Sequence, residues 1–407
     1  MVYSIRVVPS CHHKQALSDF DGAIRSCFEC FSNLRPDDTQ WEQATLSTRS
    51  GGLGLRSLER HNSAAYIASR SSCISLCQHL DPEHVPEWSI PSSIDQTCLE
   101  HYNSLVQSEQ RVAQNISEPL SQRTLSETLD KASVLSLLNP ATSTTSQRAH
   151  LRLVSVAGAG SWLHCPPTTS SGNAVNPQLY SVMLQRRLRM PVFENDDFCS
   201  LCSGIMDSYG DHALTCPCGG DRTKRHNLIR NQTHRAALRA GFKSAELEKP
   251  GLLRPRPCIA GSPEDGSTPS GDTDNSDQRR PADVYIPRWR RGCPIALDFA
   301  VTSGLREEFI AISEQDPQQA VLQYEGFKCA FLNTQQQCIE EGFTFTPVVM
   351  EAVGGGIGPQ GAAVIAELAK STASASGESA DNCAVSIMQS LQITLHRENA
   401  RALLRRN

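Results

Sequence analysis

The stretch RPADVYIPRWRRGCPIALDFAVTS, residues 280–303, decides the fold class of this 407-residue chain. Two apolar segments, ADVYIP at 282–287 and PIALDFAV at 294–301, flank the polar turn RWRRGC at 288–293. Short apolar runs around a turn that contains glycine are typical of two paired strands. This part of the chain should therefore form a sheet.

Helical and strand patterns alternate around these two strands. A helix should begin at Asp316, a good N-cap, because Pro317 fits the first helical position and Gln319 completes a capping box. The elements expected beyond residue 222 are, in order, a helix at 223–241, a strand containing Glu248, strands at 282–287 and 294–301, a helix at 316–341, a strand at 343–351 and a helix at 360–371. This order predicts an α/β sheet domain over 223–375 and a helical tail over 376–407.

Residues 1–185 carry a different pattern, in which apolar residues recur at helical spacing. The spacing is clear in 59–78 and 99–138, and proline-containing breaks fall at 82–91 and 139–146. We therefore expect a helical N-terminal half beside the sheet domain, which makes the fold class α+β.

The composition limits the classes of function. A net charge of −5 and a pI near 6.2 argue against a generic polyanion binder, although basic residues cluster in 222–239. No stretch approaches the length of a membrane span, so no membrane partner is expected. Sixteen cysteines without a visible secretory signal indicate a reducing compartment, where cysteines are free thiols or metal ligands. The polar, low-complexity segment 260–280 should form a flexible excursion.

A short segment rich in cysteine, glycine and aspartate, residues 186–222, lacks periodicity, so something other than an apolar core must hold it together. Its candidate metal ligands are Cys199, Cys202, His212 and Cys216. A CxxC pair followed by a His and Cys pair can close a tetrahedral Zn²⁺ site, and the metal then supplies folding energy. Cys218 competes with Cys216 for the fourth position, and the alternative interpretation is a set of reduced surface cysteines. Four protein ligands predict a structural zinc.

Two carboxylates lie on the expected pair of strands. Asp283 is at the start of the first strand, and Asp298 lies inside the second among apolar residues. A carboxylate there is costly unless it is paired or binds a cation. Two carboxylates on adjacent strands can hold Mg²⁺, which can activate water at a phosphodiester. Glu248 and Glu351 are further candidates to assist at the metal. The alternative role for Asp298 is to accept hydrogen bonds from backbone amides.

The expected helix adds a basic group to this set. Lys328 shares one helix face with Val321, Tyr324 and Phe331, so its ammonium lies on an apolar stripe turned toward the sheet. The two aspartates or a scissile phosphate would then be its partner. In that role Lys328 orients the attacking water or stabilises the developing charge. The alternative is that its side chain extends to solvent.

Two basic stretches are candidates for contacts with nucleic acid. The helix at 223–241 carries several arginines, and the turn at 288–293 carries arginines around Trp289. Arginines there can contact phosphates, and the tryptophan can stack at a strand end. The candidate residues are Arg225, Arg230, Arg235, Arg290 and Arg291. The alternative is a solvated helix.

Four stretches together resemble a known family. They are MVYSIRVVP at 1–9, DDTQWEQATLSTRSGGLGLRSLERHNSAAYIAS at 37–69, GDHALTCPCGGDRTKRHNLIRN at 210–231 and RPADVYIPRWRRGCPIALDFAVTS at 280–303. In this order they look like the C-terminal half of a non-LTR retrotransposon reverse transcriptase polyprotein. The type is the one that ends in a restriction-like endonuclease of the PD-(D/E)xK superfamily.

The resemblance implies a role for each part of the chain. Residues 1–185 would be a thumb and linker remnant, matched by Trp41, Gln43 and 51–56. Residues 186–222 would be a zinc knuckle with the Cys-Cys-His-Cys ligands, and 223–375 the endonuclease with catalytic carboxylates at Asp283 and Asp298 and Mg²⁺ as cofactor. Such endonucleases nick genomic target DNA, and reverse transcription is primed from the nick. The implied partners are target DNA and the element RNA, with no small-molecule substrate, and the implied location is the nucleus.

Three features depart from the family's pattern. The motif is PAD instead of PD, and Ala300 stands where the pattern has its lysine, so Lys328 must take that role. No YxDD-type motif occurs in the sequence, and we expect no polymerase activity, because the polymerase's metal-binding aspartates would lie upstream of Met1. The sequence thus leaves two functions open, a metal-dependent DNA endonuclease and a catalytically inactive zinc-dependent nucleic-acid-binding remnant. The product of a decayed element with no selected role is a third.

Overall fold

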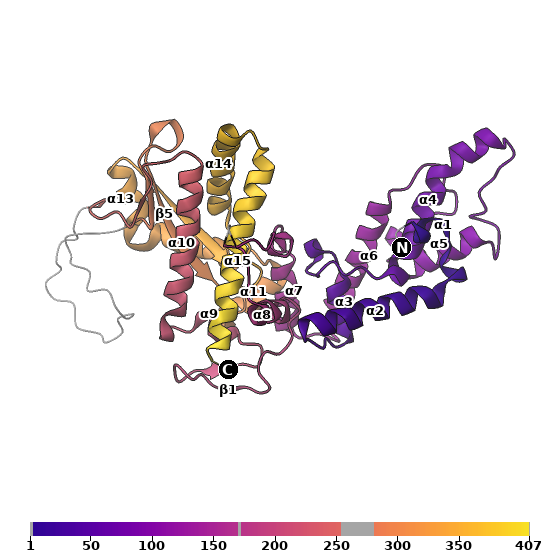
Figure 1. Cartoon of the computed structure of the whole chain (residues 1–407), viewed down its shortest axis with the longest axis horizontal. Helices are drawn as coiled ribbons and strands as arrows, with labels where there is room; N and C mark the ends of the chain where they lie inside the picture. Colours follow the sequence, from indigo (N-terminus) through magenta and orange to yellow (C-terminus); the bar gives the residue numbers. More distant parts are fainter. Residues whose placement is uncertain (1–2, 170–171, 254–280, 407) are drawn as a thin grey trace.

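The computed structural model describes residues 3–169, 172–253 and 281–406 of the chain; the whole low-complexity segment 260–280, expected to form a flexible excursion, lies outside the described residues. The described residues before 188 form helices and no strand. Their α-helices are α1 (Ser4–Val7), α2 (Lys14–Ser32), α3 (Asp38–Thr45), α4 (Leu58–Leu80), α5 (Ile94–Ser104), α6 (Gln122–Leu137), α7 (Thr145–Val154) and α8 (Pro177–Arg187). The molecule is elongated, with α1, α4 and α5 at one end and the sheet at the other (Figure 1).

The far end of the molecule has its own apolar core between α4, α5 and α6. Ile67, Leu99, Tyr102 and Leu129 are buried in it. Helical spacing predicted α4 closely, but the expected segment 99–138 is divided into α5 and α6 by an irregular connection. A serine N-cap begins α4, α5 and α6 in turn, each side chain accepting a hydrogen bond from a backbone N–H in the first turn.

The sheet has four strands in the described part of the chain. They are β3 (Glu246–Leu247), β4 (Val284–Ile286), β5 (Ile295–Thr302) and β6 (Thr344–Glu351), and they lie side by side in that order. β3 and β5 both pair antiparallel with β4, and β6 pairs parallel with β5. Strands are present in the four expected regions, although Glu248, expected inside the first, follows β3 with a φ of 47°. The mixed helix and sheet content agrees with an α+β class.

Helices cover both faces of the sheet. The helices α10 (Asp221–Arg239) and α14 (Pro359–Ser376) pack on the face that carries Ile295, Leu297 and Phe299 of β5. The opposite face carries Ala300, which packs against Val321 and Val349. Because successive residues of a strand point to opposite faces, Asp298 shares the second face with Ala300.

The expected tail is a central helix. α15 (Ala380–Leu404) packs against α8, α10 and α14. Leu391 and Leu395 belong to the sheet core, while Ile393 and Leu403 belong to a second core with Phe28 of α2. α15 is therefore shared by two cores, and Figure 1 shows it running along the sheet-containing body. Polar residues at both ends of 376–407 gave the sequence a tail-like appearance, although the middle is buried.

The expected helix at 316–341 is broken. Within that range the structure has two helices, α12 (Gln319–Ala330) and α13 (Thr334–Glu340), and a further helix, α11 (Glu307–Gln315), ends just before it. Asp316 is the C-cap of α11, since the residue before a proline disfavours helix, and its carboxylate accepts hydrogen bonds from the backbone of Gln318 and the side chain of Gln319. Leu332 and Asn333 have positive φ values of 51° and 56°, which turn the chain between α12 and α13.

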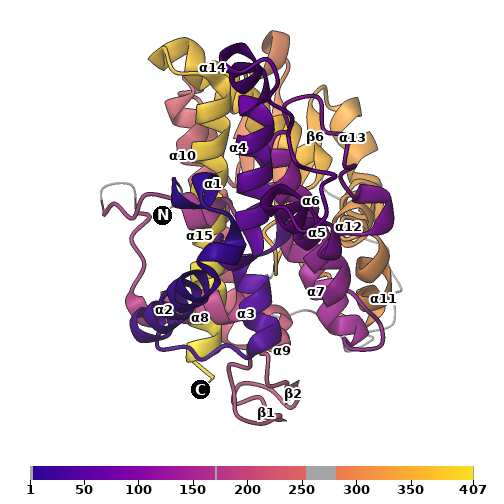
Figure 2. The ribbon, with the colours of Figure 1, turned by 90° about the vertical axis from the view of Figure 1, so that its right-hand side faces the viewer.

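A small module projects beside these layers. It contains the hairpin β1 (Asp197–Phe198) and β2 (Ile205–Met206) and the short helix α9 (Asp211–Thr215). Short 3-10 helices complete the described secondary structure: η1 (Ser10–His12), η2 (Thr48–Ser50), η3 (Ser108–Gln110), η4 (Ser161–His164), η5 (Cys218–Gly220), η6 (Arg290–Gly292) and η7 (Phe331–Asn333). Figure 2 shows the β1–β2 hairpin extending from the end of the molecule where the C-terminus also lies.

A buried arginine joins the N-terminal helices to the rest of the molecule. Arg187, at the end of α8, donates hydrogen bonds to the carbonyl oxygens of Thr48, Gly52 and Ala159. A Cβ on Gly52 would lie 2.2 Å from the backbone oxygen of Leu46, so the chain at this junction passes too closely for any other residue. The glycine pair at 51–52 thus has a packing reason.

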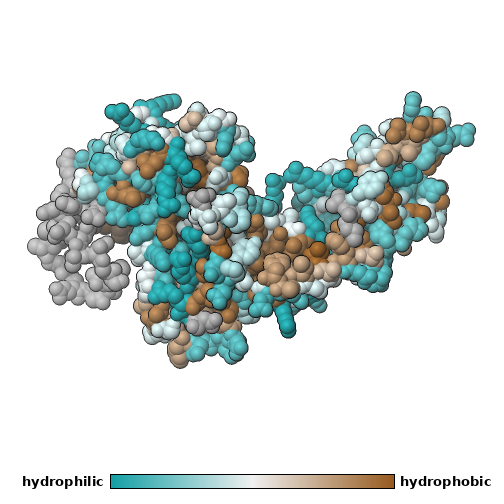
Figure 3. Space-filling view, viewed as in Figure 1, coloured by the Kyte–Doolittle hydropathy of each residue, from teal (hydrophilic) through white to brown (hydrophobic). Residues whose placement is uncertain are grey.

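The surface is mostly hydrophilic in the view of Figure 3, with apolar surface gathered near the middle, where α2 lies. Among the described residues, no helix combines the length and the apolar character needed to span a membrane.

Candidate functional site

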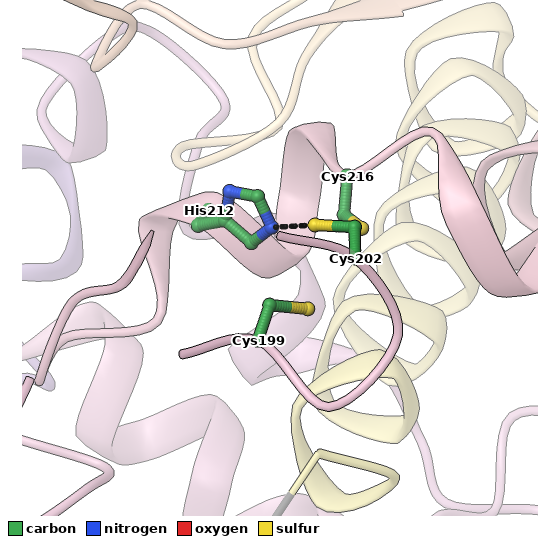
Figure 4. Close-up of side chains that lie close together, drawn as sticks. All are labelled: Cys199, Cys202, His212 and Cys216. Carbon is green, nitrogen blue, oxygen red and sulfur yellow. Dashed lines mark hydrogen bonds between the residues drawn. The ribbon is translucent and has the colours of Figure 1, made fainter. Parts of the chain in front are cut away.

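Three cysteines and a histidine converge in the small module. Cys199, Cys202, His212 and Cys216 each offer a ligand atom, and these atoms all lie within 4.8 Å of one another (Figure 4). The Cys202 Sγ lies 3.2 Å from His212 Nε2 and 3.7 Å from the Cys216 Sγ. Ligand atoms of a tetrahedral zinc site lie about 3.5–3.8 Å apart, because Zn–S and Zn–N bonds are about 2.3 and 2.0 Å. The donor set and its spacing therefore fit a metal ion such as zinc.

The geometry distinguishes Cys216 from Cys218. Cys216 follows α9 directly and is buried with its sulfur in the cluster, whereas Cys218 is outside it and starts η5. At Gly204 a Cβ would lie 2.7 Å from the His212 ring, so the loop after the CxxC pair closes tightly over the cluster. The fourth member of the cluster is thus Cys216.

The environment of the cluster favours thiolate sulfur at Cys199, whereas the neighbouring thiols of Cys216 and Cys199 raise the pKa of Cys202. Burial alone would raise the pKa of Cys199, but the N–H groups of Leu201 and Cys202, the Cys202 thiol and the Arg406 guanidinium lower it to about 6. Arg406 has a fully buried side chain and is held by the carboxylate of Asp221 at 2.7 Å. A thiolate is the form that binds a metal, so this arginine beyond α15 supports the cluster electrostatically.

Ion pairs attach the module to the body of the protein. The Asp211 carboxylate lies 2.8 Å from Arg186 and 2.7 Å from Arg189. Burial would raise the pKa of Asp211, but the two guanidiniums hold it well below its usual range. Asp207 accepts hydrogen bonds from the backbone N–H groups of Asp211 and His212, which fixes the start of α9 and the position of the ligand.

Asp283 and Asp298 lie opposite each other on neighbouring strands. Val284 pairs with Leu297 in the antiparallel register, so the next position on each strand brings the two aspartates together. The Asp283 carboxylate accepts hydrogen bonds from the backbone N–H of Phe299 at 2.6 Å and from His226 Nε2 at 3.0 Å. Asp283 is therefore fixed by the strand and by α10 together.

Lys328 reaches this pair from α12. Its Nζ lies 2.9 Å from Oδ2 of Asp298, and both side chains are largely buried, 25% and 20% exposed. Burial acts to lower the pKa of Lys328, but the charge of Asp298 and the hydrogen bond to it outweigh burial, so the pKa rises and the amine stays charged. For Asp298, burial and the charge of Asp283 raise the pKa against the opposing effect of Lys328. The site thus carries crowded negative charge.

The two glutamates expected to assist lie in different surroundings. Glu351 is buried at the end of β6, where it accepts hydrogen bonds from the backbone N–H groups of Gly304, Val353 and Gly354. It therefore serves the loops at the strand end, and burial raises its pKa. This corrects the expectation that Glu351 assists at the metal. Glu248 lies closer, since its backbone N–H donates to the Asp283 carbonyl oxygen at 3.0 Å.

The arginines expected to contact nucleic acid divide into two groups. Arg225 is buried and donates hydrogen bonds to Asn399 of α15 and to the Leu214 carbonyl, so it is not placed for a phosphate contact. Arg230 is also buried and forms an ion pair with Glu248. Both expectations are corrected by this burial. The physical reason is α15 for Arg225, through Asn399, and the carboxylate of Glu248 for Arg230.

The remaining arginines are exposed. Arg235 lies on the solvent side of α10, and Arg291 lies in the turn before β5. Arg290 is half-exposed and forms an ion pair of 2.9 Å with Glu367. Trp289 packs against Phe242 at a ring-centroid distance of 5.0 Å, so the base of this turn is rigid.

Sequence reasoning missed two contributors to these sites. His226 was counted only as part of a basic helix, yet it bonds Asp283. Arg406 was not considered, because nothing in its sequence neighbourhood connects it to cysteines far away along the chain. A signal for His226 existed, since it lies on the same face of α10 as the buried Ile229 and Arg230.

Comparison with protein-family models finds no family that matches this chain, and comparison with curated proteins finds no match. The functional argument therefore rests on the geometry of the two sites and on the motifs in the sequence.

Proposed function

We propose that this protein is a metal-dependent DNA endonuclease, the target-nicking part of a non-LTR retrotransposon reverse transcriptase polyprotein. The observation that carries the proposal is the convergence of Asp283, Asp298 and Lys328 from two strands and a helix. The sequence pattern predicts the same trio. A mixed sheet flanked by helices is compatible with the restriction-like domain that the resemblance implies.

The residues at the acidic site fit a divalent cation. Asp283 and Asp298 bring two carboxylates together with one neighbouring lysine. Lys328 pairs with Oδ2 of Asp298 at 2.9 Å. Hard oxygen ligands of this kind suit Mg²⁺. When bound by Asp283 and Asp298, Mg²⁺ would supply Lewis-acid stabilisation of a phosphodiester and a more acidic water.

The protein's own side chains would do the remaining work. His226 and the Phe299 N–H orient the Asp283 carboxylate. Lys328 keeps its positive charge beside Asp298, where it can orient the attacking water or balance the charge that develops on the phosphate. Exposed Arg235 and Arg291 are available for phosphates farther along the DNA.

The cysteine and histidine cluster would have a structural role in this proposal. Four protein ligands around a zinc ion leave no position for substrate. A bound metal would hold the β1–β2 hairpin to α9, which packs against α15, and the whole module would help to hold target DNA. A DNA substrate implies work in the nucleus, and the element RNA is a further candidate partner.

The decisive experiment is nicking of supercoiled plasmid by the purified chain with Mg²⁺, compared with Asp298→Ala. We expect nicking that falls to background in the variant. Glu340→Ala, which changes an exposed acid on α13, is the control and should nick at the wild-type rate. Circular dichroism of all three proteins checks that they are folded.

The competing function is zinc-dependent nucleic-acid binding without catalysis. The observation that favours it is Ala300, because the family's lysine position is apolar and packs in the core with Val321 and Val349. No nicking by the wild-type chain, with zinc bound and DNA retained in a mobility-shift assay, would establish this function instead.

A further inference from the structure

A row of aromatic side chains lies on α12 beside the acidic site. The ring centroids of Tyr324 and Phe327 are 5.7 Å apart, and those of Phe327 and Phe331 are 5.3 Å apart. Phe327 and Phe331 are 52% and 51% exposed. Side chains of this size are usually buried in a core, so their exposure requires a reason.

The row is continuous with Lys328. At about 100° per residue, Tyr324, Phe327, Lys328 and Phe331 occupy one sector of roughly 100° around the helix. Within that sector Lys328 is nearest the sheet, where it bonds Asp298, and Phe327 is farthest from it. The aromatic row therefore begins beside the acidic site and extends along α12 toward solvent.

The contact between α12 and the sheet is already made without these rings. Val321 fills that role by packing against Ala300 and Val349, and Tyr324 lies at its margin. Phe327 and Phe331 add little to this core. Their exposure is thus not a by-product of helix packing.

The chemistry of the row fits flat, uncharged rings. Within α12 and α13 the one lysine or arginine is Lys328, which is paired with Asp298, so a phosphate backbone has little to attract it there. Exposed aromatic rings bind nucleobases by stacking, and every base has a face that can stack. Bases are accessible for this only where they are unpaired.

We propose that Tyr324, Phe327 and Phe331 stack on unpaired bases next to the phosphodiester that is hydrolysed at the acidic site. The preferred substrate is then DNA whose strands are separated at the cleavage position. This inference rests on the proposed nuclease function and adds the substrate class to it. A second copy of the chain is the competing occupant of the same face, and the experiment below distinguishes the two.

The test measures binding apart from cutting. The zinc-loaded wild-type chain, without added Mg²⁺, is titrated into a DNA duplex with a central bubble that contains 2-aminopurine, and into the fully paired duplex. Stacking quenches 2-aminopurine fluorescence. We expect tighter binding and quenching with the bubble, and a loss of affinity of about tenfold or more in Phe327→Ala/Phe331→Ala, from the usual effect of removing stacking partners.

Two matched variants give the readout its specificity. Ile339→Ala removes an equally exposed apolar side chain from α13 and should leave the affinity unchanged. Phe327→Trp keeps an aromatic face and should retain quenching. Equal affinities of the wild type and the double variant for the bubble would overturn the proposal. So would a wild-type dimer in sedimentation velocity that the double variant abolishes, because the row would then be a contact between copies.

The outcomes also separate this inference from the nuclease proposal. If quenching depends on the aromatic row but the chain does not nick DNA with Mg²⁺, base stacking by the row is supported and the nuclease function is refuted. Nicking without any preference for opened DNA would support the nuclease and refute the row.

Discussion

The cysteine and histidine cluster and the acidic site are assembled in different ways. The ligands of the cluster lie within 199–216, on a hairpin loop and a short helix that have little regular structure of their own. The acidic site draws Asp283, Asp298 and Lys328 from two paired strands and a separate helix. Sheet register and core packing fix the second site, whereas the first has only a two-residue hairpin, the ion pairs of Asp211 and a margin of the second core to support its ligands. The first should therefore need a metal to be ordered, and the second should not.

Removal of zinc should produce the largest difference between the two sites. Structural zinc contributes about 10–16 kcal/mol to the folding of small finger peptides, so chelation or Cys202→Ala should unfold the β1–β2 module. The sheet should remain folded. Hydrogen exchange measured by mass spectrometry should show fast exchange at 196–216 and continued protection at 295–302. Cys293→Ala, an exposed cysteine outside the cluster, is the control. Equal loss of protection in both segments would contradict the contrast.

Loss of the lysine should damage only the acidic site. Lys328→Met removes the positive charge beside Asp298 and should reduce the nicking rate by about 10²–10³-fold, as removal of a group that stabilises transition-state charge does. The zinc content should stay the same. Plasmid nicking and zinc analysis measure the two effects on one sample. Lys370→Met, on the exposed side of α14, should behave as wild type, and a similar loss in that variant would refute a specific role for Lys328.

Two arginines of α10 compare a buried position with an exposed one. Arg225→Ala breaks buried hydrogen bonds to Asn399 and Leu214, so the free energy of unfolding should fall by about 2–4 kcal/mol. Arg235→Ala, at the surface, should change it by less than about 0.5 kcal/mol but weaken DNA binding equally for all sequences. Urea denaturation and salt-dependent binding measure the two. A larger loss of stability from Arg235→Ala than from Arg225→Ala would contradict the placement of Arg225 on the buried face of α10.

The smallest expected effect is a dependence of stability on pH. The pKa of Asp298 in the folded protein lies above its ordinary value of 3.8, because of burial and the charge of Asp283. Between the two pKa values the folded state binds more protons than the unfolded state. The contribution of Asp298 to the free energy of unfolding therefore falls as the pH rises through that window. The wild type should become less stable relative to Asp298→Asn from pH 4 upward. Urea denaturation at several pH values measures the free energy of unfolding of both proteins. If the wild type instead gained stability relative to Asp298→Asn as the pH rose, the charge of Lys328 would have the larger effect on the pKa of Asp298.

Local chemistry made much of the structure predictable. The strands around 280–303 follow from apolar runs beside a glycine turn, and the start of α10 and the span of α14 lie close to the expected positions. Spacing predicted three members of the cysteine and histidine cluster, because a short loop leaves few arrangements for a CxxC pair and a nearby histidine. The trio of Asp283, Asp298 and Lys328 followed from two periodicities, alternation in the strand and 3.6 residues per turn in the helix.

The rest depends on contacts that no local pattern carries. Arg225 and Glu351 are titratable residues of ordinary appearance in the sequence, yet α15 and the strand-end loops bury them. The break between α12 and α13 uses left-handed backbone at Leu332 and Asn333, which leucine rarely adopts. The choice of Cys216 over Cys218 required the position of α9. Each of these was decided by tertiary packing.

The sharing of α15 between two cores has a consequence for how the chain folds. Ile393 and Leu403 close a core that also contains Phe28, so contacts there join residues hundreds of positions apart in the sequence. Folding rates fall as the average separation of contacting residues rises, because long loops must close before such contacts form. The two cores should therefore form late and together, as one slow kinetic phase, while the helices at the far end form early. During synthesis, the N-terminal helices would wait for α15 with Phe28 still exposed to chaperones.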